Sequence, residues 1–243
     1  MIKPTVVLLH GVGLDRAMWE PVVDRLADAF DVVAPDLPGH GARPPAPAGV
    51  RLADLAAGVV EEVPSGSHLV GFSLGALVAQ HLALHRPALA ATLASVSSVC
   101  RRTAEEREAV LARLRMAERD FAASAAASVR RWYEGTDVDS KQIARTEATL
   151  LANDQDSFVN CYRVFATADA EIGPDLGRIS VPALAVTGER DPGSTPAMTH
   201  RLARAMPDCR AVVIPGARHM LPVERPQAFV DCLTTFIGEY AHV

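Results

Sequence analysis

The chain has 243 residues, of which 49% are hydrophobic and 22% charged. This composition is typical of one large globular domain, or of one domain carrying an insertion. Lys and Arg number 24 against 29 Asp and Glu, which gives a formal net charge of −5. The weakly acidic balance argues against nucleic acid or an anionic membrane surface as the main partner, because both require a basic face.

The chain shows no sign of a targeting or membrane segment. Its first apolar run, Val6–Leu9, is too short for a secretory signal, and no run approaches the roughly 18 apolar residues of a membrane helix. None of the four cysteines forms a C-x-x-C pair. A chain of this length needs no disulfides for stability, so we expect free thiols in a reducing compartment and a cytoplasmic protein.

Short apolar runs recur along the chain, and most are followed by a helical pattern. Parallel strands that are buried on both faces are typically continuous apolar runs of this kind. The predicted strands are Thr5–Leu9, Val32–Ala34, His68–Gly71, Leu89–Ser95, Ala183–Val186 and Ala211–Ile214. The predicted helices among them are Trp19–Phe30, Leu74–His85, Pro196–Met206 and Pro226–Tyr240. The alternation predicts an α/β fold with a mostly parallel sheet flanked by helices.

One region, residues 101–172, interrupts this alternation. Arg102–Tyr133 and Ser140–Thr167 are rich in the strong helix formers Ala, Arg, Glu and Leu, and no strand pattern is visible there. We therefore predict a core of residues 1–100 and 173–243, with residues 101–172 inserted as a helical cap. Insertions at the carboxyl ends of parallel strands cover the crevice where ligands bind, so the cap is expected to act as a lid.

The segment Gly71–Gly75 has the pattern G-x-S-x-G, with a predicted strand before it and a predicted helix after it. In a strand-to-helix turn this tight, the central serine is held in a strained conformation, and only small residues fit two positions before and after it. The pattern predicts Ser73 as a nucleophile, at a helix N-terminus that favours a developing anion. The alternative is a glycine-rich corner in which Ser73 only caps the helix.

A serine nucleophile needs a base, and the base needs an orienting acid. Of the eight histidines, His219 lies in the loop after the last predicted strand, from which it can reach over Ser73. Asp191 lies in the loop after the preceding strand, and it is a better candidate acid than Glu189, which we expect to face solvent or pair with Arg190. The order Ser73, Asp191, His219 is the chain order of one class of catalytic triad.

Two backbone N–H groups are expected to form an oxyanion hole. Leu74 follows the predicted nucleophile and supplies one. The loop His10–Gly13 follows the first strand and supplies the other, which we assign to Val12. A dinucleotide-binding loop is the alternative for the two glycines of this loop, but the third glycine of that pattern would fall on Arg16.

His81 and His85 are spaced as i and i+4 on a predicted helix and are an alternative metal pair. The glutamate of H-E-x-x-H is missing, and so is a nearby carboxylate ligand. We therefore predict no metal site.

Together these segments resemble the α/β-hydrolase superfamily over nearly the whole chain. The matching segments are His10–Gly13, Asp36–Gly41, Gly71–Gly75, Gly188–Asp191 and Gly216–His219. The resemblance implies a Ser-His-Asp triad, no cofactor and a helical cap at the position of the insertion. Within the superfamily the chain is most similar to 3-oxoadipate enol-lactonases and their esterase or C–C hydrolase relatives, through Arg131–Tyr133, Thr195–Met198 and Val223–Pro226.

The chain departs from the family at its start. Members usually begin with an antiparallel hairpin, whereas only four residues precede Thr5 here. We therefore expect a sheet of about six parallel strands, with Val32–Ala34 at an open edge. Because an open edge is a pairing hazard, we expect a second copy of the chain or the Pro-rich loop Arg43–Pro47 to cover it.

The resulting hypothesis is a serine hydrolase that cleaves a small carboxylic ester or (enol-)lactone through an acyl-enzyme. The alternatives are a hydrolase of C–C bonds in vinylogous diketones and a ligand sensor with very slow turnover. A substrate carboxylate would be bound by arginines of the cap through a bidentate fork. The candidates for substrate contact are Met18, Trp19, Arg130, Arg131, Trp132 and Arg163.

Overall fold

The structure, a computed structural model, describes residues 3–240. Its six strands form one sheet in the order β2-β1-β3-β4-β5-β6, and all neighbours are parallel. The strands are β1 (Thr5–Leu9), β2 (Asp31–Val33), β3 (Ser67–Phe72), β4 (Ala90–Val96), β5 (Ala183–Gly188) and β6 (Cys209–Ile214). The predicted α/β fold is confirmed, with the short β2 at one edge.

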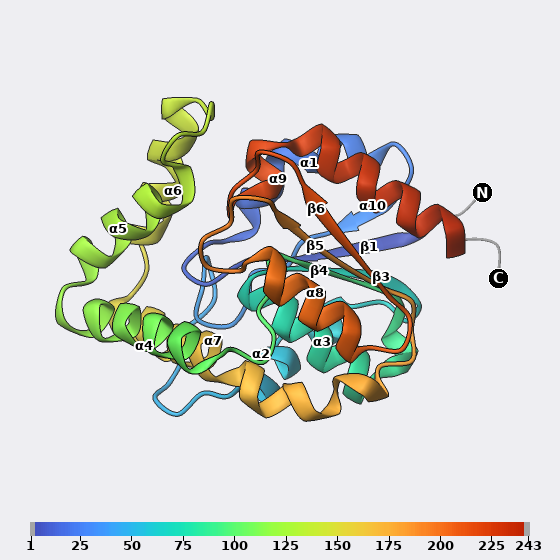
Figure 1. Cartoon of the computed structure of the whole chain (residues 1–243), viewed down its shortest axis with the longest axis horizontal. Coiled ribbons are helices and arrows are strands. Elements are labelled where there is room, and N and C mark those ends of the chain that lie inside the picture. The colour runs from blue at the N-terminus through green and yellow to red at the C-terminus, as the bar shows by residue number, and fades with distance from the viewer. Residues whose placement is uncertain (1–2, 241–243) are drawn as a thin grey trace.

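Helices cover both faces of the sheet (Figure 1). On one face α1 (Glu20–Ala27) packs against α10 (Pro226–Tyr240), and on the other α3 (Leu74–His85) packs against α2 (Leu52–Ala57), with α8 (Pro196–Ala205) beside β5 and β6. The short elements are α9 (Leu221–Glu224) and the 3-10 helices Arg16–Trp19, Val60–Glu62, Pro87–Leu89 and Gly173–Arg178. Helix α2 was not predicted.

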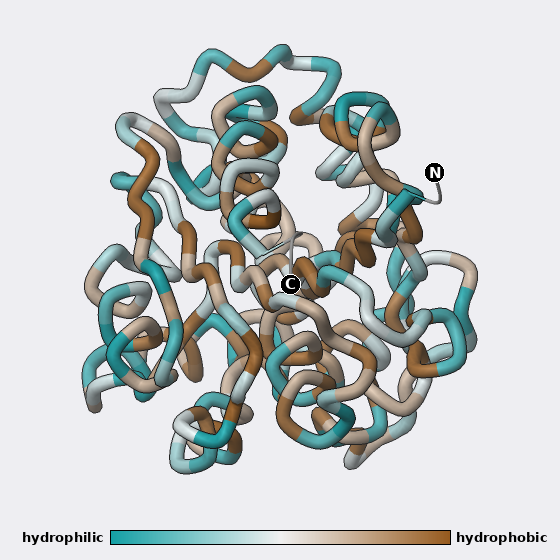
Figure 2. The backbone as a smooth tube through the Cα atoms, turned by 90° about the vertical axis from the view of Figure 1, so that its right-hand side faces the viewer, coloured by the Kyte–Doolittle hydropathy of each residue, from teal (hydrophilic) through white to brown (hydrophobic). Residues whose placement is uncertain are grey.

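The hydrophobic core is built from the apolar runs of the sequence. All six residues of β3 are buried, which explains why this strand lacks the alternation of a half-exposed one. Most of α3 is buried as well, because it contacts β3 on one side and other helices on the rest. Figure 2 shows the apolar segments concentrated in the interior. Across residues 3–240, none of the helices combines the length and apolarity that crossing a membrane requires.

Four helices lie between β4 and β5, beside the carboxyl ends of the strands (Figure 1). They are α4 (Ala104–Arg119), α5 (Phe121–Tyr133), α6 (Ser140–Leu151) and α7 (Gln155–Ile172). Asp120 and Asp154 accept N–H groups in the first turns of α5 and α7 and so separate each helix from the one before. The helical insertion is confirmed, whereas its domain boundaries stay a prediction. We call residues 101–172 the cap.

A buried ion pair ties the two ends of the cap together. The Arg102 guanidinium lies 2.6 Å from Asp169 Oδ1, and the Arg102 N–H donates to Oδ2 of the same carboxylate at 2.8 Å. Both side chains are almost fully buried, at 1% and 0% exposure. Burial lowers the pKa of Arg102, while the carboxylate opposes that shift. The segment that leaves β4 and the segment that returns toward β5 are thereby joined.

The Pro-rich segment 43–47 is held against the cap. The Ala46 N–H donates to the Ser157 hydroxyl at 2.9 Å, and the Asn160 side chain donates to the Ala46 carbonyl at 3.0 Å. The segment thus connects the loop after β2 to α7. That a second copy of the chain or this segment covers the β2 edge stays a prediction.

We expect Asp169→Ala to lower the free energy of unfolding by about 3–5 kcal/mol, because it leaves the Arg102 guanidinium buried without a counter-charge. Urea denaturation followed by circular dichroism measures the change. The matched control is Glu118→Ala, which removes the exposed ion pair with Arg163 and should change stability by less than about 1 kcal/mol. Equal effects of the two substitutions would contradict a role for burial.

Candidate active site

Ser73 lies at the turn between β3 and α3 in a strained backbone conformation. Its φ is 53° and its ψ is −109°, a combination that costs a non-glycine residue about 1–3 kcal/mol. A Cβ at Gly71 would overlap the Gly75 carbonyl, and a Cβ at Gly75 would overlap the Leu9 carbonyl. Both glycines are therefore required by the close approach of α3 to β3 and β1.

His219 and Asp191 form a buried pair, with His219 Nδ1 2.7 Å from Asp191 Oδ2. The other oxygen of the carboxylate accepts the N–H groups of Gly193 and Ser194 at 2.9 and 2.8 Å. Burial opposes ionisation, but the charge of His219 and these hydrogen bonds outweigh it and hold the pKa of Asp191 below its ordinary value. An ionised acceptor at Oδ2 places the proton on Nδ1 and leaves Nε2 of the neutral ring free to accept one.

Ser73, His219 and Val12 line one cavity beneath the cap. Within the described residues the imidazole is bonded to Asp191, and no hydrogen bond joins it to the Ser73 hydroxyl. Such bonds are often formed only once substrate is bound. The cavity measures about 30 Å³, whereas ligand sites usually measure roughly 300–1,000 Å³. A substrate can therefore enter only if the cap or a lining side chain moves.

The N–H groups of Val12 and Leu74 have no acceptor among the hydrogen bonds of residues 3–240. Leu74 begins α3, where N–H groups point outward from the helix. The loop that holds Val12 is fixed by His10, whose Nδ1 bonds to the Gly11 carbonyl and whose Nε2 accepts the Leu37 N–H at 2.9 Å. Burial lowers the pKa of His10 to about 4, which keeps this ring neutral.

Two aromatic rings lie against the His219 imidazole. The Trp132 ring of the cap stacks on it, with centroids 5.6 Å apart and planes 27° apart. The Phe72 ring lies 5.0 Å away on a tilted plane. The backbone of the histidine is held by the Ser97 hydroxyl, which donates to the His219 carbonyl at 3.0 Å. The imidazole is thus enclosed by the core and the cap together.

Two arginines of the cap line the same cavity, Arg131 from α5 and Arg113 from α4. The Arg131 guanidinium donates to the Ser128 hydroxyl at 3.0 Å, and Arg113 Nε donates to the Tyr162 hydroxyl at 3.3 Å. Within the described chain, neither forms an ion pair with a carboxylate. Burial lowers the pKa of Arg131, and the charge of Arg113 adds to that shift. The cavity therefore carries the positive charge of two arginines that form no ion pair in the described chain.

Four of the six residues proposed for substrate contact lie elsewhere. Trp19 is fully buried in the core, between aromatic rings, and Met18 lines a separate small cavity against α6. Arg130 is exposed on α5. Arg163 is exposed on α7, where it pairs with Glu118 at 2.5 Å. Only Arg131 and Trp132 line the cavity with Ser73.

Several residues near the site were absent from the prediction, among them Arg113, Ser97 and Glu224. Glu224 is buried on α9 and accepts the Arg218 N–H at 2.8 Å, next to His219, while burial raises its pKa. Glu189, the rejected acid, is exposed and accepts the Gly216 N–H instead of pairing with Arg190. The sequence alone does not identify these three residues, because the place of each side chain depends on which side of its element faces the site.

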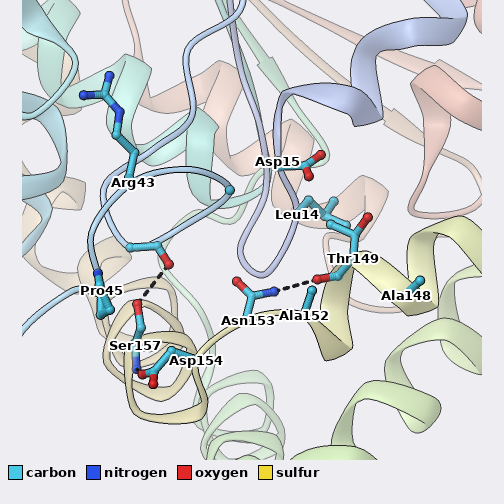
Figure 3. Close-up of a pocket in the computed structure, with 12 residues that line it drawn as sticks. Leu14, Asp15, Arg43, Pro45, Ala148, Thr149, Ala152, Asn153, Asp154 and Ser157 are labelled. Carbon is cyan, nitrogen blue, oxygen red and sulfur yellow. Dashed lines mark hydrogen bonds between the residues drawn. The ribbon is translucent and has the colours of Figure 1, made fainter.

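A larger cleft of about 560 Å³ lies between the loop 39–45 and the turn from α6 to α7 (Figure 3). Neither Ser73 nor His219 lines it. Contacts between cap and core border it: the Ser157 hydroxyl donates to the Gly39 carbonyl at 2.9 Å, and Asn153 Nδ2 donates to the Gly13 carbonyl at 2.9 Å. The turn of the cap is thereby attached to the loop that carries Val12.

The alternative metal pair, His81 and His85, lies on α3 with ring centroids 4.3 Å apart. In the part of the chain described, no group of three or more potential metal ligands gathers around these or any other residues.

Comparisons with known proteins agree with this architecture. The model of the alpha/beta hydrolase family matches residues 6–232. A pimeloyl-[acyl-carrier protein] methyl ester esterase of Aeromonas hydrophila is 30% identical, over 97% of this chain and 96% of the relative. An (E)-2-((N-methylformamido)methylene)succinate hydrolase of Acinetobacter baylyi is 29% identical, over 91% of this chain and 86% of the relative.

Among solved structures, the enol-lactonase of Burkholderia xenovorans LB400 superimposes with a TM-score of 0.84 and 25% identity, over 98% of this chain and 92% of that one. The sheet order, the cap between β4 and β5 and the family match lead to the same conclusion. The chain belongs to the alpha/beta hydrolase family.

Proposed function

We propose that the protein is a serine hydrolase that cleaves a small carboxylic ester or enol-lactone through an acyl-enzyme. The observation that carries the proposal is the His219 imidazole, hydrogen-bonded to the buried Asp191, in the same cavity as the strained Ser73. A corner that served only to cap a helix would need neither the imidazole nor the buried carboxylate beside it.

The reaction follows from these positions. His219 Nε2 takes the proton of the Ser73 hydroxyl as its oxygen attacks the substrate carbonyl, and Asp191 stabilises the imidazolium that forms. The N–H groups of Val12 and Leu74 donate to the oxyanion. His219 then protonates the leaving oxygen. In the second half, it activates a water molecule that releases the acyl group and regenerates the free serine.

The charge of the cavity supports a substrate that carries a carboxylate. Arg113 and Arg131 have no acidic partner in the described chain, and an arginine binds a carboxylate through two parallel hydrogen bonds. The names of two similar proteins, a hydrolase of a succinate derivative and an enol-lactonase, are consistent with this class. We therefore propose an acidic ester or lactone over a neutral one.

For the nucleophile, we expect Ser73→Ala to lower kcat on an activated ester by roughly 10⁶-fold and to abolish labelling by a fluorophosphonate probe. Steady-state kinetics and mass spectrometry of the labelled protein measure the two effects. Ser194→Ala removes a second serine hydroxyl that lines the cavity, and this variant should keep the label. Label on Ser73→Ala, or a single burst without turnover on every ester and lactone tested, would contradict the enzyme that we propose.

For the substrate, we expect Arg131→Gln and Arg113→Gln to lower kcat/KM for a carboxylate-bearing ester by roughly 10- to 100-fold, because each removes a charged hydrogen-bond donor. Turnover of the corresponding neutral methyl ester should change far less. Arg163→Gln is the matched control, since its guanidinium is exposed and paired with Glu118. Equal losses on the acidic and the neutral ester would count against a carboxylate site.

A further inference from the structure

The cap touches the loop that carries the base. We call residues 217–220 the base loop. The Trp132 ring stacks on the His219 imidazole, and the Arg218 guanidinium donates to the Arg131 carbonyl at 2.8 Å. Both contacts fall at the end of α5, on consecutive residues of the cap and consecutive residues of the base loop. One short segment of the cap thus touches the base loop twice.

The core holds the backbone of the base loop independently of the cap. The Ser97 hydroxyl donates to the His219 carbonyl at 3.0 Å, and Glu224 accepts the Arg218 N–H at 2.8 Å. Asp191 fixes the edge of the ring through Nδ1. The contribution of the cap to the imidazole itself is therefore the Trp132 indole, which covers one face of the ring.

An indole face differs from an aliphatic cover in its charge distribution. The face of a tryptophan ring is negative, so it attracts a cation within about 6 Å of its centroid, and the attraction is largest where water is excluded. The neutral imidazole gains little from this field, whereas the imidazolium formed during proton transfer gains more. At 5.6 Å and nearly parallel, Trp132 is placed to act on the charged form of His219.

Other charged and titratable groups surround the ring, and they come from every element packed against it. Asp191 and Glu224 contribute negative charge from the loop after β5 and from α9. Arg113 and Arg131 contribute positive charge from α4 and α5, and the Tyr162 hydroxyl of α7 lines the same cavity. The Arg218 guanidinium comes from the base loop itself and donates to the Arg131 carbonyl. A substitution at position 132 removes none of these charges, so comparing an aromatic with an aliphatic residue at this position separates the effect of the ring from theirs.

We propose that Trp132 is a positioning residue for the base: its indole stabilises the imidazolium of His219, so the base reaches full strength only while the cap is in place. The proposal rests on the role of His219 in the proposed function. It assigns to the cap a part in the proton transfer beyond enclosing the substrate.

The test compares Trp132→Leu, which keeps an apolar cover without the ring, with Trp132→Phe, which keeps an aromatic face. The control is Asn153→Ala, which breaks another contact between cap and core, at the Gly13 carbonyl. The pH dependence of kcat/KM on a neutral activated ester is measured for each variant. The titration of the His219 imidazole is followed by NMR, with His219→Gln to assign its signal.

We expect the acid limb of the profile to move to lower pH by roughly 0.5 to 1 unit in Trp132→Leu, with a roughly 3- to 30-fold lower plateau. Trp132→Phe should stay close to the wild type, and Asn153→Ala should leave the limb where it is. The NMR titration should shift in parallel with the kinetic limb.

Equal shifts in Trp132→Leu and Trp132→Phe, or the same shift in Asn153→Ala, would overturn the proposal, because they would point to a general loosening of the cap. An unchanged imidazole titration in Trp132→Leu would overturn it as well. The NMR measurement does not depend on turnover. It therefore separates failure of this proposal from failure of the proposed hydrolase, which would appear instead as labelling that survives Ser73→Ala.

Discussion

The backbone contact between α3 and the sheet constrains everything that happens at Ser73. At Gly71 and Gly75 the helix approaches β3 and β1 so closely that no side chain fits between them. This approach forces the intervening serine into a strained conformation and directs it to the carboxyl edge of the sheet. The strain is sustained by the burial of the elements on either side, since all of β3 and most of α3 are buried.

The cap is attached at the same edge of the sheet. It leaves the core after β4 and returns before β5, and the buried ion pair of Arg102 and Asp169 joins its two ends. From there it reaches both sides of the candidate site: Asn153 bonds to the loop that carries Val12, and Trp132 lies on His219. The loops that carry Val12 and His219 are about 200 residues apart in the chain, and the cap contacts both of them. Movement of the cap therefore affects both loops together.

The sequence predicted the sheet and the cluster of Ser73, Asp191 and His219 because parallel strands end at one edge. Residues that follow apolar strand runs must then come together, whatever their separation in the chain. The strand ends are set by short buried runs, which are easy to recognise when both faces are covered. The bounds of the cap helices were harder to predict, because Asp120 and Asp154 each begin a new helix within a longer helical pattern.

The residues of the cap could not be assigned in the same way. Arg163 and Arg113 both lie in helical segments of the cap, and the rotation of α7 and α4 against the core directs one to solvent and the other to the cavity. Trp19 shows the converse: its place near the oxyanion loop suggested a ligand contact, but the packing of α10 places Phe229 beside it in the core. Which side of a helix faces the core is set by tertiary packing, and the periodicity of the sequence alone does not determine it.

The small size of the cavity at Ser73 has a consequence for the acceptor of the acyl group. A cavity of about 30 Å³ has room for water, but it is far smaller than the roughly 300–1,000 Å³ of sites that hold organic ligands. If the cap returns to this position during the proposed acyl transfer, water fits beside the imidazole more readily than an alcohol or an amine. The enclosure thus favours hydrolysis over transfer of the acyl group to a second organic molecule.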